Sequence, residues 1–570
     1  MPNYRQLSPG DRALNVPRHV GDNVLPNLPF FEKLLRFAHR DPPRVAIRDL
    51  NAGIEKTYVQ LLTDAIVLRR ALKDTLSPAT QTQLDNDQEV FIALIAPGGY
   101  DYAVAFTAIL ALGAAVVPIS PALPIAEAKS LILRAQCVAI LSSTTTTPLA
   151  RGIINAIPHT LPNIQISSHL QANHIPASSL SISSSPVPNM NTASLIIFTS
   201  GTTGPPKAAV QRRSYITSSA EDVADQYGLT ENDTVLHMLP VHHATGIGIT
   251  FLPFLVSGAC VEFRSGAFDV AWTWERWKKG QGGISVFSGV PTMYIRLMRY
   301  FESRISNLPE GEMDGYIVGA RGIRVFLCGT SALPAPVQEF WTRILDGRQI
   351  LTRFGGTEFH AVLKAGLSGG APTNSVGIVS PGVDVKLSEE GMVLVRGPNL
   401  FSKYLGDEAA TKAAHDAEGY FITGDIARQE GPNYYILGRA SIDIIKSGGY
   451  KISALDIERE ILGLDYINEV MVVGVEDEEY GQRVAAAVTL KDTYASKGLT
   501  IAQLRGDLRG QLAGYKMPTL LRVLDGEIPK SVTGKVQKKI LGPRYFPPGY
   551  RDDKGVQGWV RSSERQRSKL

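Results

Sequence analysis

The chain has 570 residues, of which 44% are hydrophobic and 20% charged, a composition typical of a globular protein long enough for several packed cores. Its 58 Lys and Arg residues nearly balance its 54 Asp and Glu residues, and the resulting formal charge of +4 argues against dedicated nucleic-acid binding. We expect at least two domains, because single cores rarely grow beyond about 300 residues.

The cysteines and the N-terminal segment both argue against a secreted protein. Cys137, Cys260 and Cys328 are far apart and show no spacing typical of a disulfide framework or a zinc module, which fits a reducing compartment. The first thirty residues contain Asp11 and Arg18 and have no uninterrupted apolar segment, so no cleaved secretory signal is expected.

The longest apolar run extends from Ala103 to Ile119. It is short for a bilayer span, for which about 18 to 20 residues are needed, and it contains Gly113 and Pro118. We predict a buried helix that leads into a strand, and no stable membrane insertion.

Between about residues 91 and 330, short runs rich in Val, Ile and Phe alternate with longer mixed segments, the pattern of a layered α/β domain. The expected strands include Val90–Ala96, Ser194–Phe198, Gly283–Phe287 and Ile323–Leu327. The segment Ser142–Asn191, rich in Ser, Thr and Pro, is expected to be partly a surface connection.

The pattern changes twice in the C-terminal third. After residue 375, Gly and Pro become more frequent, and short strands at Val383–Leu387 and Met392–Val395 predict a β-rich region. From about Gly438, strand patterns flank a predicted helix at Ala454–Leu462, which indicates a small α+β domain ending near Leu541. Its junction with the preceding domain is expected between residues 438 and 443.

One loop has the composition of a phosphate-binding site. The predicted strand ending at Phe198 leads into Thr-Ser-Gly-Thr-Thr-Gly-Pro-Pro-Lys207. Glycines let backbone N–H groups converge on an anion, hydroxyls add donors, and the lysine supplies a mobile charge. The spacing differs from the GxxxxGK[ST] of a P-loop, so kinase or ATPase geometry of that type is not implied.

Further short motifs follow in a fixed order. They are Gly355-Gly-Thr-Glu358, Thr423-Gly-Asp425, Gly438-Arg439 and Ile528-Pro-Lys-Ser-Val-Thr-Gly-Lys535. With the loop, they resemble the signature motifs of the adenylate-forming superfamily, which contains acyl-CoA synthetases, firefly-type luciferases and the adenylation domains of peptide synthetases. The resemblance spans about residues 30–545 and implies an ATP-dependent acyl-CoA synthetase.

The resemblance implies a large N-terminal α/β domain of several subdomains, a small mobile α+β domain and a tail. We place these at residues 1–440, 441–545 and 546–570. It also implies ATP, Mg²⁺ and coenzyme A as cofactors or co-substrates.

The resemblance assigns a role to each motif. It implies that the nucleotide phosphates contact Thr199, Ser200, Gly201, Thr202, Thr203, Gly204, Lys207 and Thr357. It further implies that Asp425 accepts the ribose hydroxyls, that Arg439 contacts the nucleotide, and that His243 belongs to the catalytic residues. Glu358, with Thr202, would hold Mg²⁺, because a carboxylate beside a phosphate needs a cation between them.

Two lysines of the small domain are implied to serve two successive steps. Lys535 would enter the site for adenylation, where its charge stabilises the transition state as a carboxylate approaches the α-phosphate of ATP. Lys446, Gly448 and Gly449 would enter for thioester formation. Residues 441–443 are therefore candidate hinge positions.

The local sequences around Val290–Leu297, Leu239–His243 and Phe326–Ala332 look most like the malonyl-CoA synthetase branch, which implies a small dicarboxylic acid. An arginine in the acyl pocket would pair with the second carboxylate, and Arg296 is the first candidate. Gly329 is assigned to the same pocket.

Three positions depart from the family pattern. Thr245 stands where that branch tends to have histidine, which leaves open a longer or differently functionalised acid. Ala208 replaces a glycine and Phe354 a tyrosine, and neither change is expected to abolish activity. His237, His242 and His243 form no HExxH motif and are expected to be structural or to line the pocket.

The chain ends in Ser568-Lys569-Leu570, after the basic stretch Arg561–Arg567. At a free carboxyl end this tripeptide is recognised by peroxisomal import receptors. We therefore expect such a receptor as a partner and the peroxisome as the location.

Two other functions remain open at this point. The enzyme could load the acyl group onto the phosphopantetheine of a carrier protein in trans, since no carrier domain follows residue 545. Alternatively, the chain could be a nucleotide-binding scaffold without catalysis, although a scaffold would need none of Lys207, Glu358, Asp425 and Lys535. Luciferase-like oxidation is the least favoured family activity.

Overall fold

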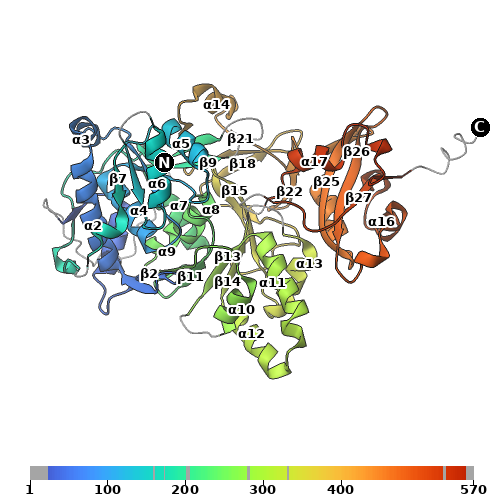
Figure 1. Ribbon diagram of the computed structural model, residues 1–570, viewed down its shortest axis with the longest axis horizontal. Helices are drawn as coiled ribbons and strands as arrows, with labels where there is room; N and C mark the ends of the chain where they lie inside the picture. The colour runs from blue at the N-terminus through green and yellow to red at the C-terminus, as the bar shows by residue number, and fades with distance from the viewer. Residues whose placement is uncertain are drawn as a thin grey trace, which may run out of the picture.

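The computed structural model describes residues 23–157, 161–171, 174–199, 206–278, 283–329, 333–530 and 535–559. In this part of the chain, two large sheets form the N-terminal domain and a smaller sheet forms the C-terminal domain. Figure 1 shows the small domain, with β25, β26 and β27, on the side of the large domain opposite helices α2 and α3.

The first sheet has seven strands, in the order β20-β10-β9-β5-β4-β6-β7. Their bounds are β4 (Phe91–Ile95), β5 (Ala115–Pro118), β6 (Ala139–Ser142), β7 (Asn163–Gln165), β9 (Ala193–Thr199), β10 (Lys207–Arg212) and β20 (Lys403–Tyr404). Strand β4 is buried along its whole length and pairs in parallel with β5 and β6, which suits its uninterrupted apolar sequence.

The second sheet has nine strands, in the order β17-β16-β15-β14-β13-β11-β12-β2-β3. Their bounds are β2 (Val45–Asp49), β3 (Ile54–Thr57), β11 (Thr234–His237), β12 (Cys260–Phe263), β13 (Val286–Gly289), β14 (Val325–Cys328), β15 (Leu351–Gly356), β16 (His360–Lys364) and β17 (Ile378–Val379). From β2 to β15 the neighbouring strands run parallel, so their carboxyl ends share one edge.

Helices fill the space between the two sheets and cover their outer faces. Buried residues of both sheets share one core with α1 (Pro29–Ala38), α2 (Tyr58–Thr75), α4 (Tyr100–Leu112), α7 (Arg213–Gln226) and α9 (Leu252–Val256). The outer face of the first sheet packs against α5 (Ile125–Arg134) and α6 (Thr147–Ala156). The outer face of the second packs against α10 (Val270–Lys278), α11 (Pro291–Ser303), α12 (Glu310–Gly322) and α13 (Ala335–Ile344).

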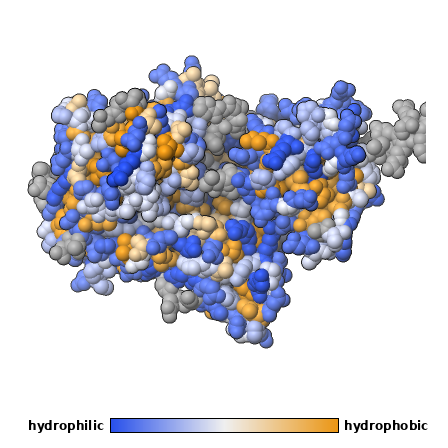
Figure 2. All heavy atoms as spheres, viewed as in Figure 1, coloured by the Kyte–Doolittle hydropathy of each residue, from blue (hydrophilic) through white to orange (hydrophobic). Residues whose placement is uncertain are grey.

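The run from Ala103 to Ile119 folds as predicted. Helix α4 ends where Gly113 adopts a left-handed conformation (φ +90°), and β5 begins two residues later. None of the helices in the described part of the chain combines the length and the apolar character that a bilayer span requires. Figure 2 shows hydrophilic and apolar residues mixed over the visible face.

A further, four-stranded antiparallel sheet packs against the large domain and precedes the small domain in the chain. It consists of β18 (Asp384–Leu387), β19 (Met392–Arg396), β21 (Phe421–Glu430) and β22 (Asn433–Arg439). The predicted strands at 383–387 and 392–395 are thereby confirmed. The remaining short elements are β1 (Val24–Leu25), β8 (Ser181–Ile182), α3 (Pro78–Asp85), α8 (Ala244–Thr250) and α14 (Glu408–Ala413).

The small domain contains a six-stranded sheet covered by helices on both faces. Its elements are β23 (Ile444–Ser447), β24 (Tyr450–Ser453), α15 (Ala454–Leu462), β25 (Ile467–Asp477), β26 (Gly481–Leu490), α16 (Ile501–Asp507), β27 (Leu520–Leu524), α17 (Lys538–Tyr545) and β28 (Gln557–Gly558). The predicted helix at 454–462 is confirmed, with Ser453 as its N-cap.

The packed part of the small domain extends past the predicted end at residue 545. Phe546 and Tyr550 are buried in its core, and β28 pairs with β27. Two aromatic residues and a closing strand thus lie in the segment 546–570, which the resemblance assigned to a tail. The tripeptide 568–570 lies outside the described residues.

Candidate active site

The Gly355–Glu358 motif covers the end of β15 and the start of the tight turn that leads into β16. A side chain at Gly355 would place its Cβ 2.1 Å from the carbonyl oxygen of His360, so only glycine fits. Buried Gln211 of β10 donates a hydrogen bond of 2.6 Å to the carbonyl of Thr357. The turn is therefore held from both sheets at the point where Thr357 and Glu358 emerge.

Glu358 is half-buried, and Tyr404 positions its carboxylate. The Tyr404 hydroxyl donates a hydrogen bond of 2.9 Å to Oε1 of Glu358, and the Lys207 ammonium lies 4.6 Å from the centre of the Tyr404 ring. Tyr404 is brought here because β20 pairs with β10, Tyr404 opposite Ala209. No local motif marks this tyrosine, so sequence reasoning missed it.

Asp425 and Arg439 face each other across strands β21 and β22. The Arg439 Nε lies 3.1 Å from the Asp425 carboxylate. Asp425 is 8% exposed, and burial raises its pKa to about 6, against the opposing positive charge of Arg439. Above pH 6 the carboxylate is thus mainly ionised and able to accept hydroxyl hydrogen bonds.

Lys535 of the small domain lies within electrostatic reach of these groups of the large domain. Burial and the charge of Arg439 lower the pKa of Lys535, whereas Asp425 opposes the shift. Burial and the charge of Lys535 lower the pKa of His243 to about 4. The structure therefore brings Lys535, Asp425, Arg439 and His243 together.

The neighbouring histidines are neutral at physiological pH. His243 precedes the first residue of α8, and its ring centre lies 4.6 Å from that of His242, whose pKa burial lowers to about 3. His237 is buried and its Nε2 lies 3.0 Å from the Gly246 carbonyl oxygen, a structural position as expected.

The predicted phosphate loop lies between two paired strands. Thr199 ends β9 and Lys207 begins β10, and the two residues are directly opposite in the sheet. The other predicted loop residues, Ser200, Gly201, Thr202, Thr203 and Gly204, lie outside the described residues. Their assigned contacts remain predictions.

The site can supply only part of a magnesium shell. In the described ranges, no three His, Cys, Asp or Glu side chains form a metal-binding group. Glu358 offers carboxylate oxygen, the ligand type that Mg²⁺ prefers, and Mg²⁺ commonly takes its other ligands from water and phosphate. The residues present therefore fit an ion that arrives with a nucleotide.

The residues assigned to the second step lie away from this cluster. Lys446, Gly448 and Gly449 are exposed on the hairpin of β23 and β24, where both glycines have positive φ. The backbone N–H of Lys446 donates to Gln482 of the same domain. In this orientation Lys535, not Lys446, is at the site.

Asp443, a candidate hinge residue, contacts both domains. It accepts a hydrogen bond of 3.0 Å from the backbone N–H of Arg439 and lies 2.6 Å from the Lys538 ammonium. Lys538 also pairs with Glu458 at 2.8 Å. The hinge segment is thus anchored on either side, which sequence reasoning did not reveal.

The three residues assigned to the acid occupy different surroundings. Arg296 of α11 is exposed, and its guanidinium lies 5.4 Å from the centre of the Phe268 ring. Thr245 is half-buried in α8. A Cβ at Gly329 would lie 3.1 Å from Nε of Arg353, a buried arginine that the sequence reasoning did not assign.

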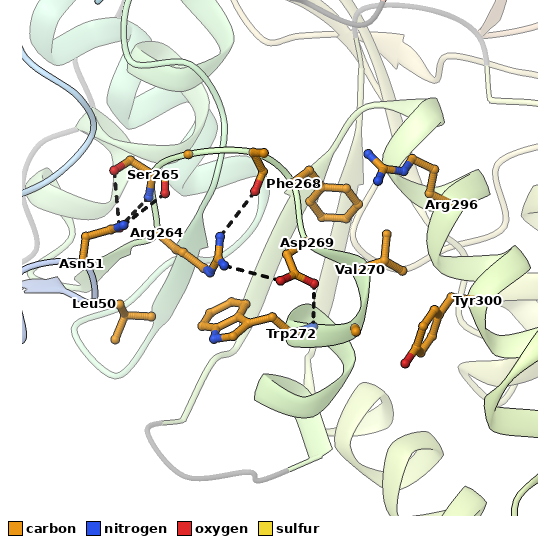
Figure 3. Close-up of a pocket in the computed structure, with 13 residues that line it drawn as sticks. Leu50, Asn51, Arg264, Ser265, Phe268, Asp269, Val270, Trp272, Arg296 and Tyr300 are labelled. Atoms are coloured by element: carbon orange, nitrogen blue, oxygen red, sulfur yellow. Dashed lines mark hydrogen bonds and ion pairs between the residues drawn. The ribbon is translucent and has the colours of Figure 1, made fainter. Parts of the chain in front are cut away.

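Arg296 lines an open pocket of about 780 Å³ beside the carboxyl ends of β2 and β12. Figure 3 shows Arg296 reaching from its helix toward Phe268, with Trp272 and Arg264 on the opposite wall. The guanidinium of Arg264 lies 4.4 Å from the centre of the Trp272 ring and 3.8 Å from Asp269. The pocket thus carries two arginines supported by aromatic rings.

Comparisons with known proteins show the family to which the chain belongs. Residues 34–405 match the family model of the AMP-binding enzymes, and residues 456–535 match that of the AMP-binding enzyme C-terminal domain. The chain is 32% identical to the acyl-CoA ligase oryP of Aspergillus oryzae, over 92% of this chain and 93% of that protein. It is 30% identical to the mitochondrial malonate–CoA ligase of Xenopus laevis, over 85% and 88%.

The fold also matches that of solved structures. ATP-bound MatB from Rhodopseudomonas palustris superposes with a TM-score of 0.75 at 25% identity, covering 92% of this chain and 99% of that chain. Both domains and the sequence motifs thus agree with one family. The chain belongs to the AMP-binding enzymes of the adenylate-forming superfamily and is an ATP-dependent acyl-CoA ligase.

Proposed function

We propose that this ligase activates a small dicarboxylic acid as its acyl-adenylate and transfers the acyl group to CoA. Lys535, Asp425, Arg439 and Glu358 lie close enough to interact electrostatically. This grouping carries the proposed formation of the acyl-adenylate. These charges from four separate segments suit a bound nucleotide and a carboxylate attacking it.

The reaction proceeds in two displacements. A carboxylate oxygen of the acid attacks the α-phosphorus of ATP, a new P–O bond forms, and pyrophosphate leaves with the electrons of the broken P–O bond. The sulfur of CoA then attacks the acyl carbon, loses its proton, and displaces AMP. Lys535 stabilises the first transition state, whereas Lys446 would serve the second after the small domain rotates.

Mg²⁺ bound through Glu358 and Thr202 would neutralise phosphate charge in the first step. The Tyr404 hydroxyl holds one oxygen of Glu358 and leaves the other for the ion. Asp425 and Arg439 would fix the nucleotide while Lys535 approaches the reacting phosphate.

The relatives support a dicarboxylic acid without deciding its length. The Xenopus laevis protein is named for malonate, whereas the Aspergillus oryzae protein is named only for an acyl-CoA. Arg296 lines its pocket, and its positive charge there favours an anionic substrate. Thr245 is the feature that favours a specialised acid as the second candidate.

We further propose that the protein is imported into the peroxisome. This import requires that Leu570 carries the free carboxylate of the chain. Microscopy of the full chain in cells, with and without residues 568–570, tests this. Diffuse signal from the full chain would contradict it.

The function is tested by measuring AMP and acyl-CoA formation with ATP, Mg²⁺ and CoA. Malonate and methylmalonate should react faster than medium-chain, branched or aromatic monocarboxylates. Turnover of monocarboxylates alone would exclude the dicarboxylate. A thioester on an added carrier protein, without acyl-CoA, would identify a carrier-loading enzyme.

A further inference from the structure

The small domain contacts the large domain at helices α11 and α13. Arg299 of α11 is half-buried, and its Nη2 donates a hydrogen bond to the backbone carbonyl oxygen of Asn468 in β25 of the small domain. At the start of α13, Cγ of Pro336 would lie 3.9 Å from a Cβ at Gly463 of the small domain. Both contacts belong to the orientation in which Lys535 is at the site.

The carbonyl of Asn468 is available for this contact because β25 is irregular at this residue. The pairing of β25 with β26 shifts register between Ile467 and Glu469, so Asn468 has no partner opposite it in the sheet. A bulged residue of this kind leaves the regular hydrogen-bond pattern of the sheet. The side chain of Asn468 is held within its own domain, where Nδ2 donates to Oγ1 of Thr489 at 3.2 Å. The bulge therefore presents a backbone acceptor to the large domain.

The residue after the bulge holds the segment that carries Lys535. Oε2 of Glu469 accepts a hydrogen bond of 2.7 Å from the backbone N–H of Ile528, and Oε1 pairs with the Lys530 ammonium. Ile528 is buried in the core of the small domain, and an antiparallel bridge joins Lys530 to Val536. Glu469 therefore fixes the start of this segment, and Lys535 lies directly before its closing bridge.

Charges of opposite sign face each other at this contact. Burial lowers the pKa of the Arg299 guanidinium, and three carboxylates oppose the shift, namely those of Glu469, Glu527 and Glu302. Glu302 lies on α11 itself, so the other two supply the attraction between the domains. The charge of Arg299 also strengthens its hydrogen bond to the carbonyl. A rotation of the small domain would remove the carbonyl and both carboxylates from Arg299 together.

We propose that Arg299 is a positioning residue that holds the small domain in the orientation for adenylation and so keeps Lys535 at the reacting phosphate. The inference rests on the proposed two-step reaction and names the contact that stabilises its first step. The effect of Arg299 passes through Asn468 and Glu469 to the segment that carries Lys535. Its role ends when the small domain rotates for thioester formation.

The first test separates the two steps in the wild-type protein, Arg299→Met and Arg299→Lys. Pyrophosphate exchange into ATP with malonate reports the first step, and thioester formation from supplied malonyl-adenylate and CoA reports the second. Arg304→Met, a change at an exposed arginine directly after the same helix, is the matched control. Thermal unfolding shows whether each variant folds.

Arg299→Met should lower pyrophosphate exchange about fivefold or more, because a charge-assisted hydrogen bond and the attraction to two carboxylates are lost. Thioester formation should stay within about twofold of the wild-type rate or rise, because this step requires the other orientation. Arg299→Lys should keep part of the exchange activity, since an ammonium still donates to a carbonyl. Arg304→Met should leave both rates unchanged.

The second test measures the orientation of the small domain and needs no acid. Pro336→Cys and Gly463→Cys are introduced together, and a short bis-maleimide joins them when the domains meet as in this structure. The three native cysteines are buried and therefore react slowly. Adding Arg299→Met should slow cross-linking by a factor similar to the loss of exchange, because both rates scale with the population of this orientation. Adding Arg304→Met should not.

The other outcomes separate the inference from the proposed function. If the wild-type protein exchanges no pyrophosphate with malonate, the proposed dicarboxylate function fails, and cross-linking alone then decides whether Arg299 holds the orientation. Unchanged exchange or unchanged cross-linking in Arg299→Met would overturn the inference, as would a wild-type background that does not cross-link. Equal losses in both steps, or a variant that does not fold, would show that Arg299 is only structural and would overturn it as well.

Discussion

Replacing Asp425 with asparagine should stabilise the free protein while weakening nucleotide binding. Burial raises the Asp425 pKa from 3.8 to about 6. The folded protein therefore keeps this proton over a pH range in which the unfolded chain has released it. Stability falls as pH rises through this range and stays reduced above it. At about 1.4 kcal/mol per pH unit, the ionised carboxylate costs about 3 kcal/mol at neutral pH.

Asparagine cannot ionise, so Asp425→Asn should escape this cost. We expect the variant's advantage in urea denaturation to grow from pH 5 to pH 8 and to approach about 3 kcal/mol. Binding of AMP should weaken, because an amide oxygen accepts ribose hydroxyls less strongly than a carboxylate. Asp465→Asn, at an exposed aspartate, is the control. Equal stabilities of the variant and the wild type, or a stability difference that does not change with pH, would refute the reasoning.

Four further outcomes follow from the geometry. Lys535→Ala should abolish pyrophosphate exchange yet leave thioester formation from supplied acyl-adenylate largely intact, and normal pyrophosphate release would contradict the assignment. Lys446→Ala should impair mainly that second step, measured with supplied acyl-adenylate and CoA. Tyr404→Phe should reduce activity at limiting Mg²⁺ by about tenfold or more, because Glu358 loses a charge-assisted hydrogen bond. Gly246→Ala should destabilise the protein by about 3 kcal/mol or more in urea, since its Cβ would meet the Pro240 carbonyl oxygen at 2.1 Å, whereas exposed Gly311→Ala should not.

Much of the fold could be predicted because strands buried on both faces have continuous apolar sequences. The strand at β4 and the succession from α4 to β5 needed only local signals, namely apolar runs and a helix-ending glycine. The end of the small domain could not be found this way. Phe546, Tyr550 and β28 depend on contacts with strands far away in the sequence.

The residues of the candidate site also fall into two groups, those with a local sequence signal and those that depend on distant contacts. Motif residues such as Glu358 and Asp425 carry a local signature, so the sequence alone could single them out as candidates for nucleotide binding. Tyr404 and Gln211 have none, because they reach Glu358 and Thr357 only through the pairing of β10 with β20 and the approach of two sheets. Arg353 adjoins a motif, but its burial and its unpartnered Nη1 are properties of the fold alone.

The contacts of Asp443 indicate where the small domain would pivot between the two proposed steps. Lys535 is at the site and Lys446 is exposed on the same domain, so a rotation is needed to exchange them. Asp443 accepts from the Arg439 N–H on one side and pairs with Lys538 on the other. If Asp443 separated from Lys538, the largely buried ammonium would lose one of its two carboxylate partners. If Asp443 separated from Arg439 instead, water could take its place at the exposed Arg439 N–H. Breaking the contact with Arg439 therefore costs less free energy, so Asp443 would stay with the small domain and the pivot would lie between residues 439 and 443, around the hinge positions that the sequence indicated.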